Sequence, residues 1–90
     1  MAKLTFSSLI SSRFKLPEKE IDVPANTLEE LFERLEDNAN GLKEFIFIER
    51  GVVNPFCAIF LNNKKIEGDC LNITLNKNDN IMILNMIAGG

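Results

Sequence analysis

Alternating apolar and polar residues mark two short strands near the start of the chain. Residues 3–9 alternate in this way, which predicts a strand that is buried on one side. The alternation returns over residues 21–23 and stops at Pro24, which has no N–H to donate within a sheet. Residues 11–17 break the pattern, so we predict a loop there that joins two antiparallel strands.

Apolar positions three and four residues apart then predict one amphipathic helix over residues 28–39. The apolar stripe of this helix consists of Leu28, Leu31, Phe32 and Leu35. Thr27 and Glu30 stand at the two positions of a capping box, in which the hydroxyl accepts from the third amide and the carboxylate reaches back. Gly41 stands where a left-handed residue commonly ends such a helix.

The rest of the chain consists of short apolar runs separated by turn residues. Strands are predicted over residues 45–48 and 81–86, around Ile66, and as segments between residues 52 and 61 that Asn54 and Pro55 interrupt. Turns are predicted at residues 49–51, 62–65 and 76–80. The order ββαβββ predicts an α+β fold, in which a mixed sheet has one main helix packed across one face.

The composition limits the classes of function that are open to the chain. Ninety residues, 46% of them hydrophobic, fit a single domain over residues 1–90, and no repeat or linker marks a boundary. Ten basic residues against thirteen acidic ones give a net charge of −3, which provides no basic field for nucleic acid. No apolar run approaches the length of a membrane span or a signal peptide. We therefore expect a cytoplasmic protein with no nucleic-acid or membrane partner.

The chain contains no histidine, which removes the commonest general base and metal ligand. Cys57 and Cys70 have neither metal-ligand spacing nor the pattern of a disulfide framework. Cys57 lies in an apolar run and Cys70 follows Asp69, so a nucleophilic thiolate is the weaker hypothesis for both. We expect no metal site, no bound cofactor and no enzymatic activity of the chain on its own.

Several charged and aromatic side chains have structural explanations. Lys64 and Lys65 lie in a predicted turn and are expected to be solvated, with the steering of an acidic partner as the weaker alternative. Three carboxylates on the outer side of the predicted helix are expected to stabilise it: Glu29, Glu30 and Glu33. Three phenylalanines fall on predicted inward positions and belong to the expected core: Phe6, Phe32 and Phe45.

The last predicted strand is apolar on both sides. Ile81 and Ile83 point one way, and we expect them to face the helix. The other side then carries an outer stripe of Met82, Leu84 and Met86. Phe60 joins the outer stripe if its alternate neighbours point inward, namely Cys57, Ile59 and Leu61. Methionine suits surfaces that pack against more than one protein, so the outer stripe predicts a partner-binding surface. Coverage by the loop of residues 49–56 and self-association are the alternatives.

The sequence finishes on residues with little or no side chain, Ile87, Ala88, Gly89 and Gly90, directly after the last predicted strand. With the order of the elements and the stretch Asn78-Asp79-Asn80-Ile81, this ending resembles the ubiquitin-like sulfur carriers of the MoaD/ThiS type, which have the β-grasp fold. Within that group the chain is most similar to the small subunit of molybdopterin synthase and next to the thiamine-pathway sulfur carrier. Residues 59–63 resemble an apolar strand of the family that ends in Asn-Gly, with Asn63 in place of the glycine.

The resemblance implies that Gly90 is a carrier and not a catalyst. A carboxylate is a poor electrophile, so a ubiquitin-activating-type enzyme would use ATP to adenylate Gly90. A sulfur donor protein would then convert the acyl adenylate into a thiocarboxylate. Residues without large side chains can enter narrow channels in different enzymes, which is the role implied for Gly89, Ala88 and Ile87.

The favoured hypothesis is the small subunit of molybdopterin synthase, which acts in molybdenum cofactor biosynthesis only in complex with a larger catalytic subunit. The resemblance implies that the larger subunit supplies the cationic residues for the pterin phosphate. Sulfur delivery for thiamine, a tungsten-pterin or tRNA thiolation remains open, as does a ubiquitin-like protein modifier conjugated through Gly90. A binding module whose two glycines are incidental is the third alternative.

Overall fold

The computed structural model describes residues 2–17, 20–49 and 51–85. In chain order its elements are β1 (Ala2–Phe6), α1 (Ser8–Phe14), β2 (Ile21–Val23), α2 (Leu28–Glu36), α3 (Leu42–Ile46), β3 (Phe47–Glu49), β4 (Val52–Val53), β5 (Cys57–Leu61), β6 (Lys64–Lys65) and β7 (Asn80–Asn85). None of the helices within those three ranges has the length and apolar character needed to cross a membrane.

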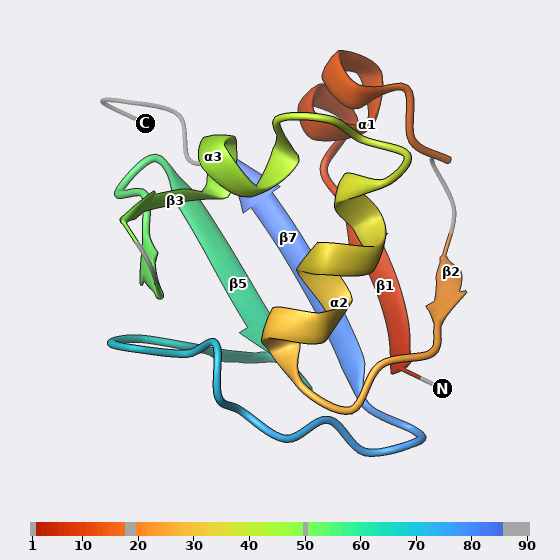
Figure 1. Cartoon of the computed structure of the whole chain (residues 1–90), viewed down its shortest axis with the longest axis vertical. Coiled ribbons are helices and arrows are strands. Elements are labelled where there is room, and N and C mark those ends of the chain that lie inside the picture. The colour runs from red at the N-terminus through yellow and green to blue at the C-terminus, as the bar shows by residue number, and fades with distance from the viewer. Residues whose placement is uncertain (1, 18–19, 50, 86–90) are drawn as a thin grey trace.

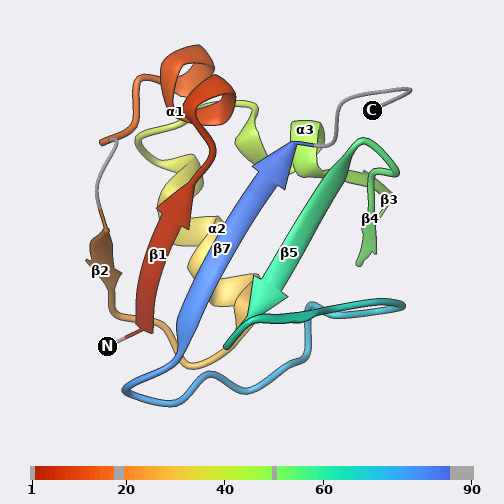
Figure 2. The same cartoon turned by 180° about the vertical axis from the view of Figure 1, so that it is seen from behind.

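Five of the strands form one mixed sheet in the order β2-β1-β7-β5-β6. β1 is parallel to β7, and the other neighbouring strands are antiparallel, including the predicted pair β1 and β2. Helices α2 and α3 lie across one face of the sheet, here called the inner face (Figure 1). From behind, no ribbon of the described residues crosses β1, β7 and β5 on the outer face (Figure 2). The predicted mixed sheet with one main helix packed across a face is confirmed.

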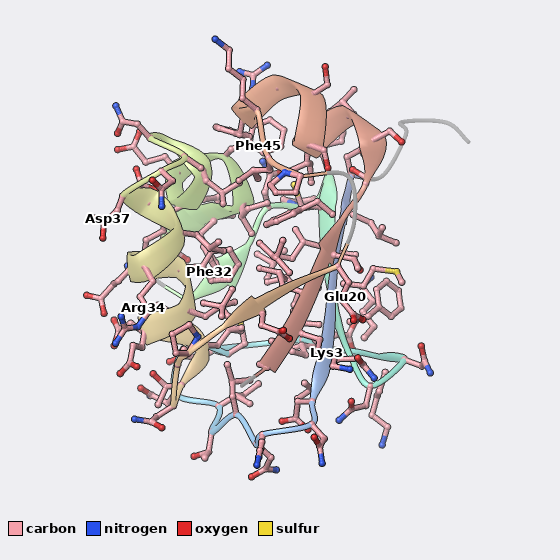
Figure 3. All side chains as sticks on the ribbon, turned by 90° about the vertical axis from the view of Figure 1, so that its right-hand side faces the viewer. Lys3, Glu20, Phe32, Arg34, Asp37 and Phe45 are labelled. Carbon is pink, nitrogen blue, oxygen red and sulfur yellow. The ribbon has the colours of Figure 1, made fainter. Side chains whose placement is uncertain are left out.

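The core lies between α2 and the inner face of the sheet. The predicted helix stripe is buried, and none of its four residues is more than 7% exposed. Phe32 points from α2 toward the sheet, whereas Arg34 and Asp37 point away from it (Figure 3). Its ring packs edge-on against that of Phe47, with ring centroids 5.0 Å apart. Each fully buried side chain of this size stabilises the fold by about 1.5–3 kcal/mol.

The start of α2 has the predicted cap. The Thr27 hydroxyl accepts the N–H of Glu30 at 3.2 Å, which satisfies one of the unpaired donors of the first turn. The Glu30 carboxylate reaches back to the N–H of Asn26 at 3.3 Å, one residue before the position expected for a capping box. The cap therefore fixes where the helix begins.

The predicted end of this helix is wrong. Helix α2 ends at Glu36, and Gly41, with φ +91°, begins α3 as its N-cap. The Glu36 carboxylate accepts the N–H groups of Gly41 at 2.6 Å and Lys43 at 3.0 Å. The last residue of α2 thus caps α3, and Gly41 supplies the left-handed turn between the two helices.

The predicted strand over residues 45–48 is therefore wrong in its first half. Phe45 and Ile46 complete α3, and the strand β3 begins only at Phe47. Leu42, Phe45 and Ile46 have helical spacing, and Leu42 and Ile46 are fully buried. The short apolar run fits a strand or a helix by pattern, and burial against the core favours the helix.

The predicted loop over residues 11–17 is also wrong in part, because α1 occupies most of it. β1 ends at Phe6, short of the predicted strand end, and the Ser7 hydroxyl caps α1 by accepting the N–H of Ile10 at 3.4 Å. Ile10 is fully buried and joins the main core cluster. A polar, serine-rich segment becomes helical here because one face of it packs against the core.

The hairpin between β5 and β6 corrects two smaller predictions. Asn62 and Asn63 make the turn with φ values of 51° and 69°, as a two-residue hairpin loop requires. Lys64 and Lys65 belong to strand β6 and not to the turn, and Ile66 follows that strand instead of forming one. Two residues with positive φ reverse the chain at once, so pairing resumes immediately after them.

The turn before β7 is held by Asp79, which is only 8% exposed. Its carboxylate accepts the N–H of Asn76 at 2.7 Å and the side-chain amide of Asn62 at 3.0 Å. These two donors stabilise the charged form and lower the pKa of Asp79 below its ordinary value. Asn62 also accepts the N–H of Asn80 at 2.9 Å, so the start of β7 is tied to the β5–β6 turn.

Candidate functional site

The predicted carrier residues follow β7 in the sequence. Ile87, Ala88, Gly89 and Gly90, together with Met86 of the outer stripe, lie outside the described residues. Strand β7 ends at Asn85, which is the last described residue before them. The surroundings of Asn85 therefore define the part of the structure from which the carrier segment continues.

Asn85 is held by contacts with the chain segments on either side of β7. It is paired with Cys57 at the start of β5, and its side-chain oxygen accepts the hydroxyl of Ser7 at 2.5 Å. The backbone N–H of Ser7 donates to the carbonyl of Ile83 at 2.9 Å. Two hydrogen bonds thus link the end of β7 to the junction of β1 and α1. We call Ser7, Cys57 and Asn85 the tail root.

Met82 and Leu84, the described residues of the outer stripe, lie on the side of β7 opposite to the buried Ile81 and Ile83. Ile81 and Ile83 are 1% and 0% exposed and belong to the core, whereas Met82 is 42% exposed. Met82 lies directly opposite Phe60 on β5 and opposite Thr5 on β1. Cys57 and Ile59 are buried in the core cluster and Leu61 packs against it, which confirms the condition set for Phe60.

The described part of the outer stripe is more exposed at one end than at the other. Leu84 is half-buried and lies opposite Ala58, which is fully buried. Val52 and Val53 line a pocket with Ala58, beside the start of β5. Strand β4 lies next to β5, however, and not over β7 (Figure 2). The described residues of this loop, 49 and 51–56, therefore lie beside Ala58 and leave Met82 exposed at the other end of the stripe.

Charged residues border the exposed end of this surface. Lys65 lies opposite Phe60 in the β5–β6 hairpin and is exposed. The Lys3 ammonium lies 3.8 Å from the carboxylate of Glu20, and Figure 3 shows the two side chains close together beside β1. A pocket is lined by Lys3, Phe60 and Met82 among others. The surface is thus an apolar centre with charged groups of both signs at its rim.

Neither cysteine has the surroundings of a reactive thiol. Cys57 and Cys70 are buried, and burial raises the pKa of both thiols above the ordinary value. The carboxylate of Asp69 raises the pKa of Cys70 further. The thiols lie 3.8 Å and 3.7 Å from the backbone carbonyls of Phe45 and Gly51, respectively. The structure thus favours the prediction that both are core residues.

The acidic side chains of α2 and the phenylalanines named in the sequence analysis lie where a structural role explains them. Glu30 lies 3.5 Å from Arg34 one turn further along α2, and Glu33 is exposed on the same helix. Phe32 is fully buried, whereas Phe6 and Phe45 are partly buried and pack against the core. Within the described ranges, no three acidic or cysteine side chains come together as a metal site would require.

Sequence reasoning missed Ser7 and Asn85. The two residues are 78 positions apart, and each is a common turn or cap residue when taken alone. Only the parallel pairing of β1 with β7 brings them together. The spacing along the chain carried no signal for this contact.

Comparison with known proteins identifies relatives over nearly the whole chain. The model of the ThiS family matches residues 11–90. A chain from the complex of subunits 1 and 2 of molybdopterin-converting factor from Helicobacter pylori 26695 is 32% identical, with a TM-score of 0.63, and the match covers 99% of this chain and 97% of that one. A search among curated proteins gives no significant match.

Two further solved structures share the fold at lower identity. The first is from the BexX/CysO complex of Amycolatopsis orientalis, with a TM-score of 0.80, 15% identity and full coverage of both chains. The second is small archaeal modifier protein 1 from Methanosarcina acetivorans, with a TM-score of 0.75, 23% identity and coverage of 99% of this chain and 95% of that one. The expected ubiquitin-like β-grasp fold is confirmed by these likenesses.

Proposed function

Because this chain belongs to the ThiS family of ubiquitin-like sulfur carriers, we propose that it carries sulfur as a thiocarboxylate on Gly90 and is the small subunit of a molybdopterin synthase. The observation that carries the choice of pathway is the 32% identity to a chain of the molybdopterin-converting factor complex from H. pylori. That match covers nearly the whole of both chains. The proposed role is that of a carrier, with catalysis supplied by partner proteins.

The proposed chemistry begins with activation of the Gly90 carboxylate. An oxygen of this carboxylate attacks the α-phosphorus of ATP in an adenylating partner, pyrophosphate leaves, and an acyl adenylate forms. Sulfur at the oxidation level of sulfide then adds to the acyl carbon, and AMP leaves with the bridging oxygen. A carbon–sulfur bond has replaced a carbon–oxygen bond without electron transfer. A persulfide donor additionally requires a thiol to cleave its sulfur–sulfur bond.

The surface of the described residues supports a carrier that docks on larger partners. Met82 and Phe60 provide an apolar centre on the outer face, and Met82 belongs to β7, the strand that leads to the tail. Apolar side chains surrounded by polar ones favour burial in a protein interface. We propose that the adenylating enzyme and the larger synthase subunit use this surface in turn, because each must receive the same tail.

We place this cycle in the cytoplasm, where ATP and reduced thiols are available. Both cysteines of the chain are free, which agrees with a reducing compartment. In this proposal the larger subunit binds the pterin substrate and supplies the cationic groups for its phosphate. The chain itself needs only to present the thiocarboxylate.

Reconstitution with purified partners tests the choice of pathway. The thiocarboxylated chain is mixed with the larger synthase subunit from the same source and with the sulfur-free pterin precursor, and the dithiolene product is measured. We expect product formation in proportion to the thiocarboxylate added, and none with the unmodified carboxylate form. Thiocarboxylate that is stable in this mixture but consumed by a thiazole-forming or tRNA-thiolating system would assign the chain to the corresponding alternative.

A protein modifier is the second candidate, and the likeness to small archaeal modifier protein 1 favours it. The same activated Gly90 could form an isopeptide bond with a lysine of a target protein. Cells that express a tagged chain would then contain larger adducts that survive denaturation and reduction. Adducts that disappear on deletion of Gly90 would support the modifier, whereas their absence alongside a thiocarboxylate pool supports the carrier.

A further inference from the structure

The tail root joins parts of the chain that are distant in sequence at the place where β7 ends. The hydroxyl of Ser7 donates to the side-chain oxygen of Asn85 at 2.5 Å, and the N–H of Ser7 donates to Ile83 at 2.9 Å. On the other side, Asn85 is paired with Cys57 of β5. The last residue of the strand is thus connected to both of its neighbours in the sheet.

Ser7 is itself held firmly. It is the N-cap of α1, and Ile10 and Ser11 in the first half of that helix are 0% and 1% exposed. Figure 1 shows α1 at the same end of the sheet as the end of β7. A hydrogen bond from Ser7 therefore ties Asn85 to the core through α1, and not only to an exposed loop.

Only five residues, 86–90, separate this anchored position from the carboxyl group of Gly90. Their contour length is at most about 18 Å, because each residue spans no more than about 3.6 Å. An enzyme that binds both the sheet and Gly90 must therefore match the position of Asn85 closely. Release of Asn85 from the sheet frees its backbone, which must then be ordered again on binding.

We propose that Ser7 and Asn85 are positioning residues that fix the point from which the tail enters its activating enzyme. This inference rests on the proposed function, because it concerns delivery of Gly90 to the adenylating site. The hydrogen bond does not take part in the chemistry. It restricts the tail before binding, and this preorganisation lowers the entropy lost in the enzyme complex.

Loss of the contact should raise the KM for the carrier more than it lowers kcat. Ordering one additional backbone residue corresponds to about a five- to thirty-fold weaker interaction. The acyl group and the leaving pyrophosphate are unchanged, so turnover of the bound carrier should stay within about twofold. Loss of folded carrier would also raise the apparent KM, so KM is calculated from the concentration of folded chain, which circular dichroism measures.

The test measures adenylation of purified variants over a range of carrier concentrations, by pyrophosphate release with the cognate activating enzyme and ATP. Asn85→Leu removes the acceptor oxygen and leaves Ser7 free to cap α1. Ser7→Thr keeps the hydroxyl that both caps α1 and donates to Asn85, and it should retain the wild-type KM. The matched control is Asn62→Gly, which removes side-chain hydrogen bonds to Asp79 and Asn80 at the opposite end of β7 and allows the positive φ of that turn.

We expect Asn85→Leu to raise KM about five- to thirty-fold, while Ser7→Thr and Asn62→Gly leave it unchanged. Amide hydrogen exchange gives a second readout without the enzyme. The N–H of Ser7, which donates to Ile83, should exchange faster in Asn85→Leu and not in Asn62→Gly. An unchanged KM in Asn85→Leu, or an equal rise in Asn62→Gly, would overturn the positioning role. A wild-type chain that the enzyme does not adenylate at all would instead overturn the proposed function, and the inference with it.

Discussion

Phe60 and Met82 lie directly opposite each other on β5 and β7, and both alternate with buried core residues, which places them on the face of the sheet away from α2. Residues directly opposite on antiparallel strands have β-carbons about 4.5–5.5 Å apart, so the two side chains form one apolar surface. Ile81 and Ile83, next to Met82 in sequence, are buried on the other face. A single strand thus contributes to both the core and the surface proposed for partner binding.

Substitution of Met82 by aspartate should weaken partner binding without unfolding the chain. Met82 is 42% exposed, so the new carboxylate remains solvated in the free protein and stability should change by no more than about 0.5 kcal/mol. In the complex that carboxylate would be buried against apolar groups, and we expect the Kd for the larger subunit to rise at least about tenfold. Isothermal titration calorimetry measures the Kd, and thermal unfolding measures the stability of the chain.

Ile48→Asp is the matched control for this prediction. Ile48 is 61% exposed, but it lies on β3, outside the five-stranded sheet. Its substitution should change neither the Kd nor the thermal transition. Equal weakening by Ile48→Asp and Met82→Asp would argue against a specific surface on the outer face.

Leu84→Asp should weaken binding as well, with a larger loss of stability than Met82→Asp, because Leu84 is half-buried.

The two cysteines should be dispensable for sulfur transfer. Burial raises the pKa of both Cys57 and Cys70, which leaves little thiolate at neutral pH. Both thiols should therefore react with iodoacetamide at least about tenfold more slowly in the native protein than in urea. A Cys57→Ala, Cys70→Ala double variant that remains folded should accept sulfur as the wild type does. Loss of sulfur loading by this folded variant would point to a thiol carrier instead of Gly90.

The contribution of Asp79 to stability should depend on pH. Its folded-state pKa is lowered by the N–H of Asn76 and the amide of Asn62, so the carboxylate stabilises the fold above its unfolded pKa of about 3.9. That contribution is lost as the pH falls through the lower folded-state value. Asp79→Ala should therefore cost about 1–3 kcal/mol at pH 7, and the difference from wild type should shrink below about pH 4.

Urea unfolding at several pH values measures this difference. Asp22→Ala provides a control, because Asp22 is exposed on the edge strand β2. The free energy of unfolding of the control should stay close to that of the wild type throughout. A difference between Asp79→Ala and wild type that stays constant from pH 7 to pH 3 would contradict the assigned role of the Asp79 carboxylate.

The faces of the sheet could be predicted because successive residues of a strand point to opposite sides, so the alternation of residue types distinguishes the two sides. The alternation of Ile81 and Ile83 with Met82 and Leu84 predicts which side of the strand faces the core and which side faces outward. Thr27 likewise predicted the start of α2, since a capping hydroxyl acts on its own next turn. Local chemistry determined these features, and local chemistry is what a single sequence records.

The missed elements depend on contacts that the sequence does not record. Gly41 was correctly placed in a left-handed turn, but its assignment to α3 depends on Glu36, which caps that helix across the turn. Helix α1 depends on burial of Ile10 in the core. The bond between Ser7 and Asn85 depends on the parallel pairing of the first and last strands. Each of these contacts joins residues of different elements, and none of them follows from the periodicity of apolar residues.

The central claim is that sulfur is carried at Gly90, and fragment mass spectrometry of the activated chain tests it most directly. The chain is incubated with its activating enzyme, ATP and inorganic sulfide, digested, and the position at which sulfur has replaced oxygen is read from the peptide fragments. The account predicts that the replacement is confined to the carboxyl group of Gly90 and is absent when Gly90 is deleted. Sulfur found on Cys57 or Cys70, or an unmodified Gly90 peptide in a fully active mixture, would contradict it.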